Sequence, residues 1–225
     1  LQFSRLSDGA FDITYDSVGY LYDYRQGVAP DAAALRAARA SVGWQHLQLD
    51  PAARTIRFGR PGMRIDLGGF AKGHVVDNSI AILRRLGIAH AVVAAGGDSH
   101  VLGDRCGRPW SIAIRDPRDA KRVVAGLPLQ DTSISTSGDY ERYFEENGHR
   151  YHHIINPATG RPTEGILTVT VIGPDGTMTD GLDTAIFVLG AEEGLKLIES
   201  YPDYETIIVD ATGKVSYSKG LVAPN

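Results

Sequence analysis

The sequence predicts an α+β fold, because strands outnumber helices, hairpins join most strands, and only one strand–Gly loop–helix–strand unit is evident. The clearest hairpins are QHLQLDPAARTIRFG (45–59), which turns at Asp50-Pro51, and YETIIVDATGKVSYS (204–218). A doubly wound parallel sheet would instead alternate strands and helices. We therefore expect a mixed or antiparallel β-sheet flanked by helices.

Three long helices are expected. PDAAALRAARASV (30–42) is rich in Ala and has Pro30 in its first turn, and AKGHVVDNSIAILRRLG (71–87) is amphipathic with Gly87 as its C-cap. Residues 180–200 are expected to form the third helix, and LQFSRLSDG (1–9) is typical of the last turns of a helix that stops at Gly9. Further strands are expected at MRIDLGG (63–69), HAVVAAGGD (90–98, buried), WSIAIRD (110–116), VVAGLPL (123–129) and ILTVTVIGP (166–174). SISTSGDYERYFEENG (133–148) is expected to begin with a strand that leads into a turn, a short element and another turn, and RYHHIINPATGRPTEG (150–165) is expected to be a strand followed by a long polar loop.

Composition narrows the function classes. The chain has 225 residues and a net charge of −4, and no basic run exceeds the pair Arg84-Arg85, which argues against nucleic-acid binding. A single cysteine, Cys106, excludes an internal disulfide. No apolar stretch reaches the ~18 residues of a membrane span, and no signal peptide is evident. Without an internal repeat or linker, we expect one domain over 1–225.

A glycine-rich stretch, Ile65-Asp66-Leu67-Gly68-Gly69-Phe70-Ala71-Lys72-Gly73, leads into the second helix. Glycines allow close backbone approach, and the N–H groups at a helix N-terminus attract anions. Lys72 adds a movable positive charge. The spacing matches neither the dinucleotide fingerprint nor the P-loop. A phosphate site and a plain strand-to-helix turn both remain open.

Two further motifs allow several interpretations. Gly97-Asp98-Ser99 is similar to a serine-protease nucleophile motif, but no G-x-S-x-G elbow exists and a glycine-rich strand end is favoured. His149, His152 and His153 suggest zinc, yet on a strand His152 faces away from the other two. A single titratable base is the better interpretation, with His153 favoured over a hydrogen-bonded structural histidine.

The stretch MTDGLDTAIFVLG (178–190) places acids at the start of a hydrophobic helix. Asp180 and Thr184 are four residues apart and share a helix face, and their oxygens are hard ligands suited to Mg²⁺. The alternative is helix capping, with Thr177 or Thr179 as the N-cap and acids favoured by the helix dipole. Capping does not explain why Thr184 lies on the face of Asp180.

Four segments in order resemble the ApbE family of flavin transferases: DGAFDIT (8–14), DLGGFAKGHVVD (66–77), STSGDYERYF with RYHHIINPATGRP (135–162), and TDGLDTAIFVLG (179–190). The resemblance covers nearly the whole chain. It implies FAD as substrate, Mg²⁺ as cofactor, and transfer of FMN through its phosphate to a Thr or Ser hydroxyl of a target protein, with release of AMP.

The resemblance also implies roles for individual residues. Asp180 and Thr184 are expected to bind the metal, with a backbone carbonyl near Gly69 and a contribution from Asp183. His153 corresponds to the essential histidine of the family, and either it or an acid on the metal, such as Asp180, is the expected base. Flavin-nucleotide contacts are expected from Ala10, Phe11, Asp12, Asp66, Lys72, Ser137, Tyr140, His153 and Ile154.

Family members normally carry a further N-terminal segment before the DGAFDIT block, and here only LQFSRLS precedes Asp8. The resemblance implies a target that is a flavoprotein subunit of a membrane electron-transfer complex. It also implies a location on the periplasmic side of the cytoplasmic membrane through an unseen N-terminal anchor, although cytosolic members exist. Two rival functions share these residues: an Mg²⁺-dependent FAD pyrophosphatase and an FAD-binding protein without turnover.

Overall fold

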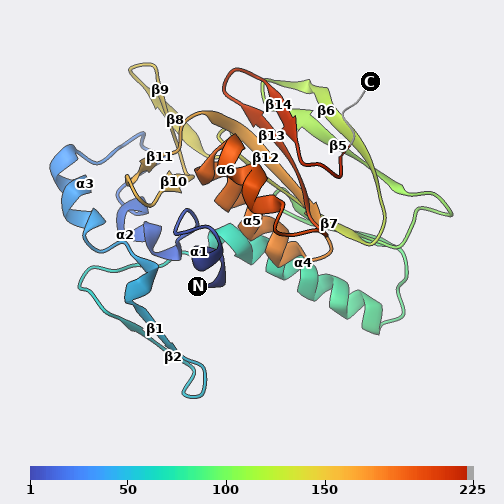
Figure 1. The fold of residues 1–225 in the computed structure, drawn as a ribbon, viewed down its shortest axis with the longest axis horizontal. Helices are drawn as coiled ribbons and strands as arrows, with labels where there is room; N and C mark the ends of the chain where they lie inside the picture. The colour runs from blue at the N-terminus through green and yellow to red at the C-terminus, as the bar shows by residue number, and fades with distance from the viewer. Residues whose placement is uncertain (222–225) are drawn as a thin grey trace. The chain divides into compact units, whose positions relative to one another are not determined.

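The computed structural model describes residues 1–221, apart from the side chain of Ala120, and these form two compact units. Unit 1 comprises residues 1–67 and 139–164, and unit 2 comprises residues 68–138 together with the described residues from 165 onward. The α+β class is confirmed, since helices flank antiparallel strands (Figure 1). The expectation of a single domain stays a prediction.

Unit 2 is built on a six-stranded antiparallel sheet with the order β14-β13-β12-β7-β4-β3. A separate hairpin, β5–β6, and three helices complete it. The strands are β3 (Ala91–Ala95), β4 (Asp98–Leu102), β5 (Trp110–Asp116), β6 (Asp119–Leu129), β7 (Thr132–Gly138), β12 (Ile166–Gly173), β13 (Glu205–Asp210) and β14 (Val215–Tyr217), and the helices are α4 (Gly68–Arg85), α5 (Gly176–Leu189) and α6 (Ala191–Ile198).

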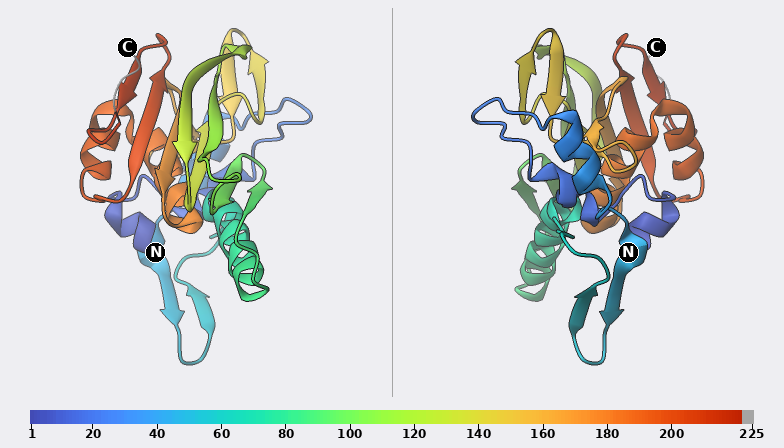
Figure 2. Two further views of the ribbon diagram at one scale, coloured as in Figure 1. Left: turned by 90° about the vertical axis from the view of Figure 1, so that its right-hand side faces the viewer. Right: turned by 90° about the vertical axis from the view of Figure 1, so that its left-hand side faces the viewer.

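Helices pack against one face of this sheet, and the β5–β6 hairpin packs against the other. Helix α5 packs against β12 and β7 and contacts α4, which itself packs against β3 and β4. The hairpin of β5 and β6 contributes Ile114 to a cluster with Ile134, Ile172 and Ile207 of the sheet (Figures 1 and 2). Because side chains alternate along a strand, Ile134 belongs to this cluster while Ser135 on β7 bonds a residue of α5. Sequence alternation thus sends the β7 serines toward the helices.

Three expectations from the sequence are corrected. MRIDLGG (63–69) forms no strand. The backbone N–H of Asp66 donates to the carbonyl of Ile13, in a 3-10 turn, instead of to a neighbouring strand, and Gly68 and Gly69 already belong to helix α4. The strand at 91–95 is half-exposed rather than buried, since it lies at the sheet edge. The single helix predicted at 180–200 is two helices, α5 and α6, and the first of them begins earlier, at Gly176. They are separated at Gly190, whose φ of 84° interrupts the helix.

Unit 1 consists of short elements. Its helices are α1 (Gln2–Leu6), α2 (Asp16–Gly19) and α3 (Ala32–Arg39), with 3-10 turns at Ile13–Tyr15 and Trp44–His46. Three two-stranded sheets pair β1 (Leu47–Asp50) with β2 (Thr55–Phe58), β8 (Tyr143–Glu146) with β9 (His149–His152), and β10 (Ile155–Asn156) with β11 (Arg161–Pro162). The β1–β2 hairpin, predicted from sequence, extends away from the helices of unit 1 (Figures 1 and 2).

Local chemistry explains the bounds of α3 and the core of unit 1. Helix α3 is shorter than the predicted 30–42, because the Asp31 carboxylate accepts the N–H groups of Ala33 and Ala34 and so sets the N-cap. One buried hydrophobic cluster of unit 1 is formed by Val18, Tyr22, Leu35 and Ile155.

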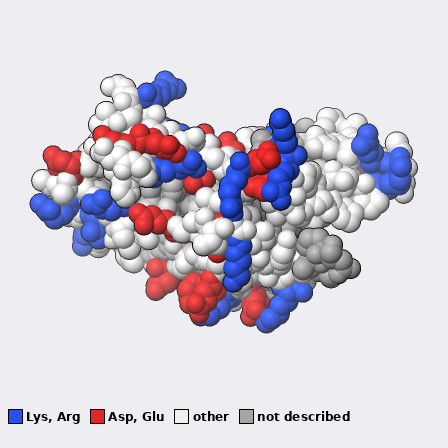
Figure 3. All heavy atoms as spheres, turned by 90° about the horizontal axis from the view of Figure 1, so that it is seen from above, with Lys and Arg blue, Asp and Glu red and all other residues white. Residues whose placement is uncertain are grey.

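One face of the molecule carries mixed charges (Figure 3). On the face shown in Figure 3, Lys and Arg side chains lie among Asp and Glu side chains rather than in one basic field. Within residues 1–221, no helix has the length and apolar character needed to cross a membrane.

A buried histidine in β4 predicts acid sensitivity. His100 is 3% exposed, and burial, followed by the charge of Arg84, lowers its pKa. Below the unfolded pKa of about 6.5 the unfolded chain therefore binds more protons than the folded chain, so stability present above that pH is lost as the pH falls. We expect His100→Asn to flatten the decline in the free energy of unfolding from pH 7 to pH 5, as measured by urea denaturation. A decline as steep as that of the unsubstituted chain would contradict this.

Candidate metal and nucleotide site

Two glycines bring helices α4 and α5 into close contact. A Cβ added at Gly73 would lie 2.0 Å from the Gly176 carbonyl oxygen, and one added at Gly176 would lie 3.0 Å from the Gly73 carbonyl oxygen. Neither position accepts a side chain without moving a helix backbone. The crossing therefore requires glycine on both helices.

Each helix then sends an aspartate, four residues beyond its glycine, to the other helix. Asp180 Oδ2 accepts the Gly73 N–H at 3.0 Å, and Asp77 Oδ1 accepts the Gly176 N–H at 2.7 Å. Asp77 Oδ2 also accepts the N–H and the hydroxyl of Thr177, each at 2.7 Å. This reciprocal pairing fixes Asp180 against the first turns of α4.

Capping does not account for Asp180. The N-cap of α5 is Asp175, whose carboxylate accepts the Met178 N–H at 2.8 Å, so the assignment to Thr177 or Thr179 is wrong. Thr179 instead hydrogen-bonds Ser135 at 2.8 Å and the Gly176 carbonyl at 2.9 Å. The first N–H groups of α5 are satisfied without Asp180, which lies in the second turn of the helix.

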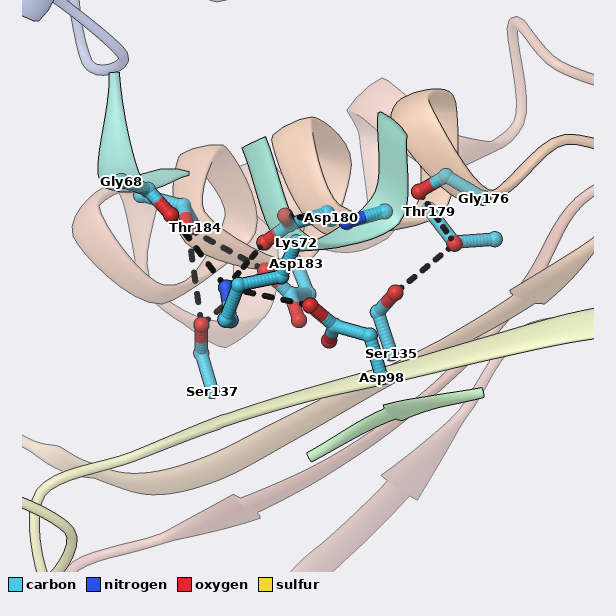
Figure 4. A network of polar contacts seen from close by, with 11 residues as sticks. Gly68, Lys72, Asp98, Ser135, Ser137, Gly176, Thr179, Asp180, Asp183 and Thr184 are labelled. Atoms are coloured by element: carbon cyan, nitrogen blue, oxygen red, sulfur yellow. Dashed lines mark hydrogen bonds and ion pairs between the residues drawn. The ribbon is translucent and has the colours of Figure 1, made fainter. Parts of the chain in front are cut away.

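Three carboxylates converge beneath this crossing (Figure 4). Asp98, at the start of β4, and Asp180 and Asp183, on α5, each offer an oxygen within 4.8 Å of the others. Their residues are 1%, 0% and 1% exposed. Such burial of three acids is unfavourable unless a cation accompanies them.

Lys72, on the first turns of α4, is one such cation. Its Nζ donates to Asp180 Oδ1 at 2.7 Å and to the Gly68 carbonyl at 3.3 Å, and it lies 3.1 Å from Asp98 Oδ2. With all groups ionised, three carboxylates and one ammonium carry a formal charge of −2. The site is therefore matched to one additional divalent cation.

Asp183 has spare capacity for such an ion. Its Oδ1 accepts the hydroxyls of Ser137, at 3.0 Å, and of Thr184, at 3.1 Å. Its Oδ2 is buried and has no hydrogen-bond partner among the described residues. An orphaned carboxylate oxygen in the interior is costly, so a metal ligand role gives this atom a physical explanation.

The close spacing of these charged side chains shifts their pKa values. Burial and the charge of Asp180 raise the pKa of Asp98 to about 7, although Lys72 opposes the shift. Burial, followed by Asp180 and Asp98, raises the pKa of Asp183 well above its usual range. Burial lowers the pKa of Lys72, but Asp180 and Asp98 outweigh that effect and raise it. The raised pKa keeps Lys72 charged, while the raised pKa values of Asp98 and Asp183 oppose their ionisation.

The donors fit Mg²⁺ and not zinc. Carboxylate, hydroxyl and carbonyl oxygens are hard ligands, and the predicted set of Asp180, Asp183 and Thr184 contributes three of them. The backbone carbonyl found at the cluster belongs to Gly68, while a role for its neighbour Gly69 stays a prediction.

The three-histidine zinc interpretation gains no support. His152 Nε2–H donates to the Thr163 carbonyl at 2.7 Å, and its Nδ1 accepts the Ile154 N–H at 3.3 Å, so both ring nitrogens are engaged. His149 is exposed on β9. Among the described residues, the one group with metal-ligand spacing is the three-aspartate cluster.

Sequence reasoning did not assign Asp98 to the site. Gly96 and Gly97, with φ of 58° and 101°, form a two-residue turn that joins β3 to β4, and Ala95 pairs with Asp98 across it. The turn places Asp98 at the start of β4, beside Lys72. The Gly-Gly hairpin signal could have located it, since two strand-forming runs flank the pair.

The remaining predicted residues lie in unit 1. His153 is half-buried and follows β9, and its backbone N–H donates to the Arg142 carbonyl at 3.1 Å. Ile154 is buried and Tyr140 half-buried. Asp66 and Ala10 are also half-buried, and Phe11 is buried with its ring centroid 5.2 Å from that of Phe3. Flavin contacts by these residues stay predictions.

Asp12 has a local role in unit 1. Its Oδ1 accepts the N–H and the hydroxyl of Thr14, at 2.8 and 2.7 Å, and its Oδ2 accepts the Trp44 N–H at 2.9 Å. Asp12 thus caps the 3-10 turn at Ile13–Tyr15 and ties it to the next 3-10 turn. This geometry accounts for the residue whether or not it meets a nucleotide.

Known proteins share this sequence and fold. The chain is 35% identical over 210 residues to the FAD:protein FMN transferase of Klebsiella pneumoniae, which covers 92% of this chain and 65% of that protein. It is 36% identical over 190 residues to the FAD:protein FMN transferase of Rhodobacter capsulatus, covering 83% of this chain and 36% of that protein. The chain thus spans under two thirds of the length of these relatives.

Solved structures agree. The ApbE protein of Thermotoga maritima superposes with a TM-score of 0.89 at 34% identity, covering 97% of this chain and 73% of that one. The flavin transferase ApbE of Vibrio cholerae gives a TM-score of 0.84 at 33% identity, covering 97% and 72%. The family model described as ApbE family matches residues 1–208. With the sequence and the fold in agreement, this chain belongs to the ApbE family.

Proposed function

We propose that the chain transfers FMN from FAD to a Thr or Ser hydroxyl of a target protein, with Mg²⁺ as cofactor and AMP as leaving group. The observation that carries the proposal is the buried cluster of Asp98, Asp180 and Asp183, with Lys72 paired to it and an oxygen of Asp183 unpartnered. Relatives named FAD:protein FMN transferase support the choice of reaction.

The residues of unit 2 have defined tasks in this proposal. Asp180, Asp183 and Thr184 hold the metal, and Ser137 orients Asp183 through its hydroxyl. A divalent cation held there supplies positive charge to the pyrophosphate of FAD, which otherwise repels a nucleophile. Lys72 supplies a further positive charge from the start of α4.

The proposed reaction is a phosphoryl-type transfer. The target hydroxyl oxygen forms a bond to the phosphorus of the FMN half, the bond from that phosphorus to the bridging oxygen breaks, and AMP departs with that oxygen. The hydroxyl proton passes to a base, which we assign to His153 from the family resemblance; a carboxylate of the cluster is the other candidate.

The target and location rest on resemblance alone. We place the target among flavoprotein subunits of membrane electron-transfer complexes, and the protein on the periplasmic side of the cytoplasmic membrane. Any membrane association is proposed to be made through an N-terminal anchor, as the resemblance implies.

A labelling assay tests the activity. The chain is incubated with FAD, Mg²⁺ and a target domain, beside a control domain in which Val replaces the acceptor Thr. In-gel flavin fluorescence on the first domain only, with an equal amount of AMP, supports transfer. Free FMN and AMP without a labelled protein would instead indicate a pyrophosphatase, and unchanged FAD would indicate a binding protein.

The base assignment has its own test. We expect His153→Gln to lower the rate of flavin labelling at saturating FAD by at least about 10²-fold, because a positioned general base contributes about 10²–10⁴. The matched control is His149→Gln, at an exposed position on β9, which should retain the rate. Full activity of His153→Gln would transfer the role of base to a carboxylate.

A further inference from the structure

Lys72 uses the same oxygens that the proposed metal requires. Asp180 has two carboxylate oxygens, and the Gly73 N–H bonds Oδ2 at 3.0 Å within the close helix crossing. Lys72 Nζ bonds the other oxygen, Oδ1, at 2.7 Å (Figure 4). The Gly73 N–H is fixed by the close packing of the two helices and stays bonded to Oδ2. A cation that binds Asp180 through Oδ1 must therefore displace the Lys72 ammonium.

Asp98 offers Lys72 a second position. Its Oδ2 lies 3.1 Å from Lys72 Nζ. The ammonium can therefore leave Asp180 and still be paired with a carboxylate, that of Asp98. The lysine side chain is 39% exposed and ends a flexible four-carbon stem, whereas the Asp98 side chain is 2% exposed at the end of a tight turn. The movable member of the pair is therefore the lysine.

From this geometry we infer that Lys72 is a built-in counter-ion that competes with the divalent cation for Asp180, and that Asp98 is the positioning residue that receives Lys72 when the cation binds. The inference rests on the metal site of the proposed function. It adds a regulated step: without metal the lysine pairs with both Asp180 and Asp98, and with metal it keeps Asp98 alone.

The charges in the cluster predict how removal of the Lys72 ammonium changes the affinity for a divalent cation. Removing the ammonium leaves three clustered carboxylates without an internal cation, which favours an added ion and disfavours the metal-free fold. We expect Lys72→Met to bind Mn²⁺ at least about tenfold more tightly than the unsubstituted chain in the absence of FAD. Its melting temperature without metal should fall, and its gain in melting temperature with Mn²⁺ should be larger.

The measurement is a titration with Mn²⁺ alone, followed by electron paramagnetic resonance of the free ion and by calorimetry. Lys214→Met removes the same charge from an exposed position in the β13–β14 turn and serves as the control, with unchanged affinity expected. Equal or weaker Mn²⁺ binding by Lys72→Met would overturn the competition. If none of the proteins binds Mn²⁺ at millimolar concentration, the metal site itself fails, and the inference fails with it.

A double-mutant cycle tests the role of Asp98. If Asp98 acts through Lys72, Asp98→Asn weakens Mn²⁺ binding by at least about tenfold in the unsubstituted chain and by less than about threefold in the Lys72→Met background. Equal losses in the two backgrounds would make Asp98 a direct ligand and overturn its role as the acceptor of Lys72.

Discussion

Asp180→Ala is expected to reduce Mg²⁺-dependent flavin transfer by at least about 10³-fold, since a bound metal supplies several kcal/mol of charge stabilisation. The substitution removes Oδ1, which faces the cluster, and Oδ2, which holds the Gly73 N–H. The rate of target labelling and the affinity for Mn²⁺ should fall together.

Asp180→Asn separates the two roles of this residue. The amide oxygen can still accept the Gly73 N–H, whereas the negative charge at the cluster is gone. We expect the Asn variant to lose metal binding as the Ala variant does, but to keep a metal-free melting temperature closer to that of the unsubstituted chain. An Ala variant that melts earlier yet labels its target at the normal rate would reduce Asp180 to a structural residue.

Gly73→Ala is expected to destabilise unit 2 by about 3 kcal/mol or more, at the upper end of the usual overpacking cost. The added Cβ would lie 2.0 Å from the Gly176 carbonyl oxygen and 2.9 Å from Asp180 Cβ. Backbone atoms cannot rotate away, so the helices must separate and the bond from Gly73 N–H to Asp180 lengthens. Urea denaturation and Mn²⁺ titration measure the two consequences.

The matched control is Gly126→Ala on β6. A Cβ there meets nothing within 4 Å, and the residue has no positive φ. We expect its stability to remain within about 0.5 kcal/mol of the unsubstituted chain. Wild-type stability of Gly73→Ala would show that α4 and α5 are not held at the separation described.

Local patterns in the sequence were sufficient for much of the fold. The β1–β2 hairpin, the β13–β14 hairpin and the amphipathic helix α4 follow from strand alternation, turn residues and helical periodicity. The strand predicted at MRIDLGG is absent, because its backbone N–H groups donate to the Ile13 carbonyl of a 3-10 turn and to the Ser17 hydroxyl, which no local pattern reveals. Tertiary context decided that segment.

The residues of the candidate site were likewise predictable only in part from the sequence. Asp180 and Thr184 could be paired from their spacing on one helix, since residues four apart share a face. The partners from elsewhere in the chain required the fold: Lys72 comes from α4, Asp98 from β4 and Ser137 from β7. The one sequence sign of the helix crossing is the repeated spacing of Gly73 to Asp77 and Gly176 to Asp180, where each aspartate bonds the glycine of the other helix.

Anomalous diffraction from crystals of the chain with Mn²⁺ and FAD would locate the metal. We expect one strong Mn²⁺ peak at about 2.0–2.4 Å from oxygens of Asp180 and Asp183, in contact with the pyrophosphate of FAD. A peak at another place, or none at these carboxylates while FAD is bound, would contradict it.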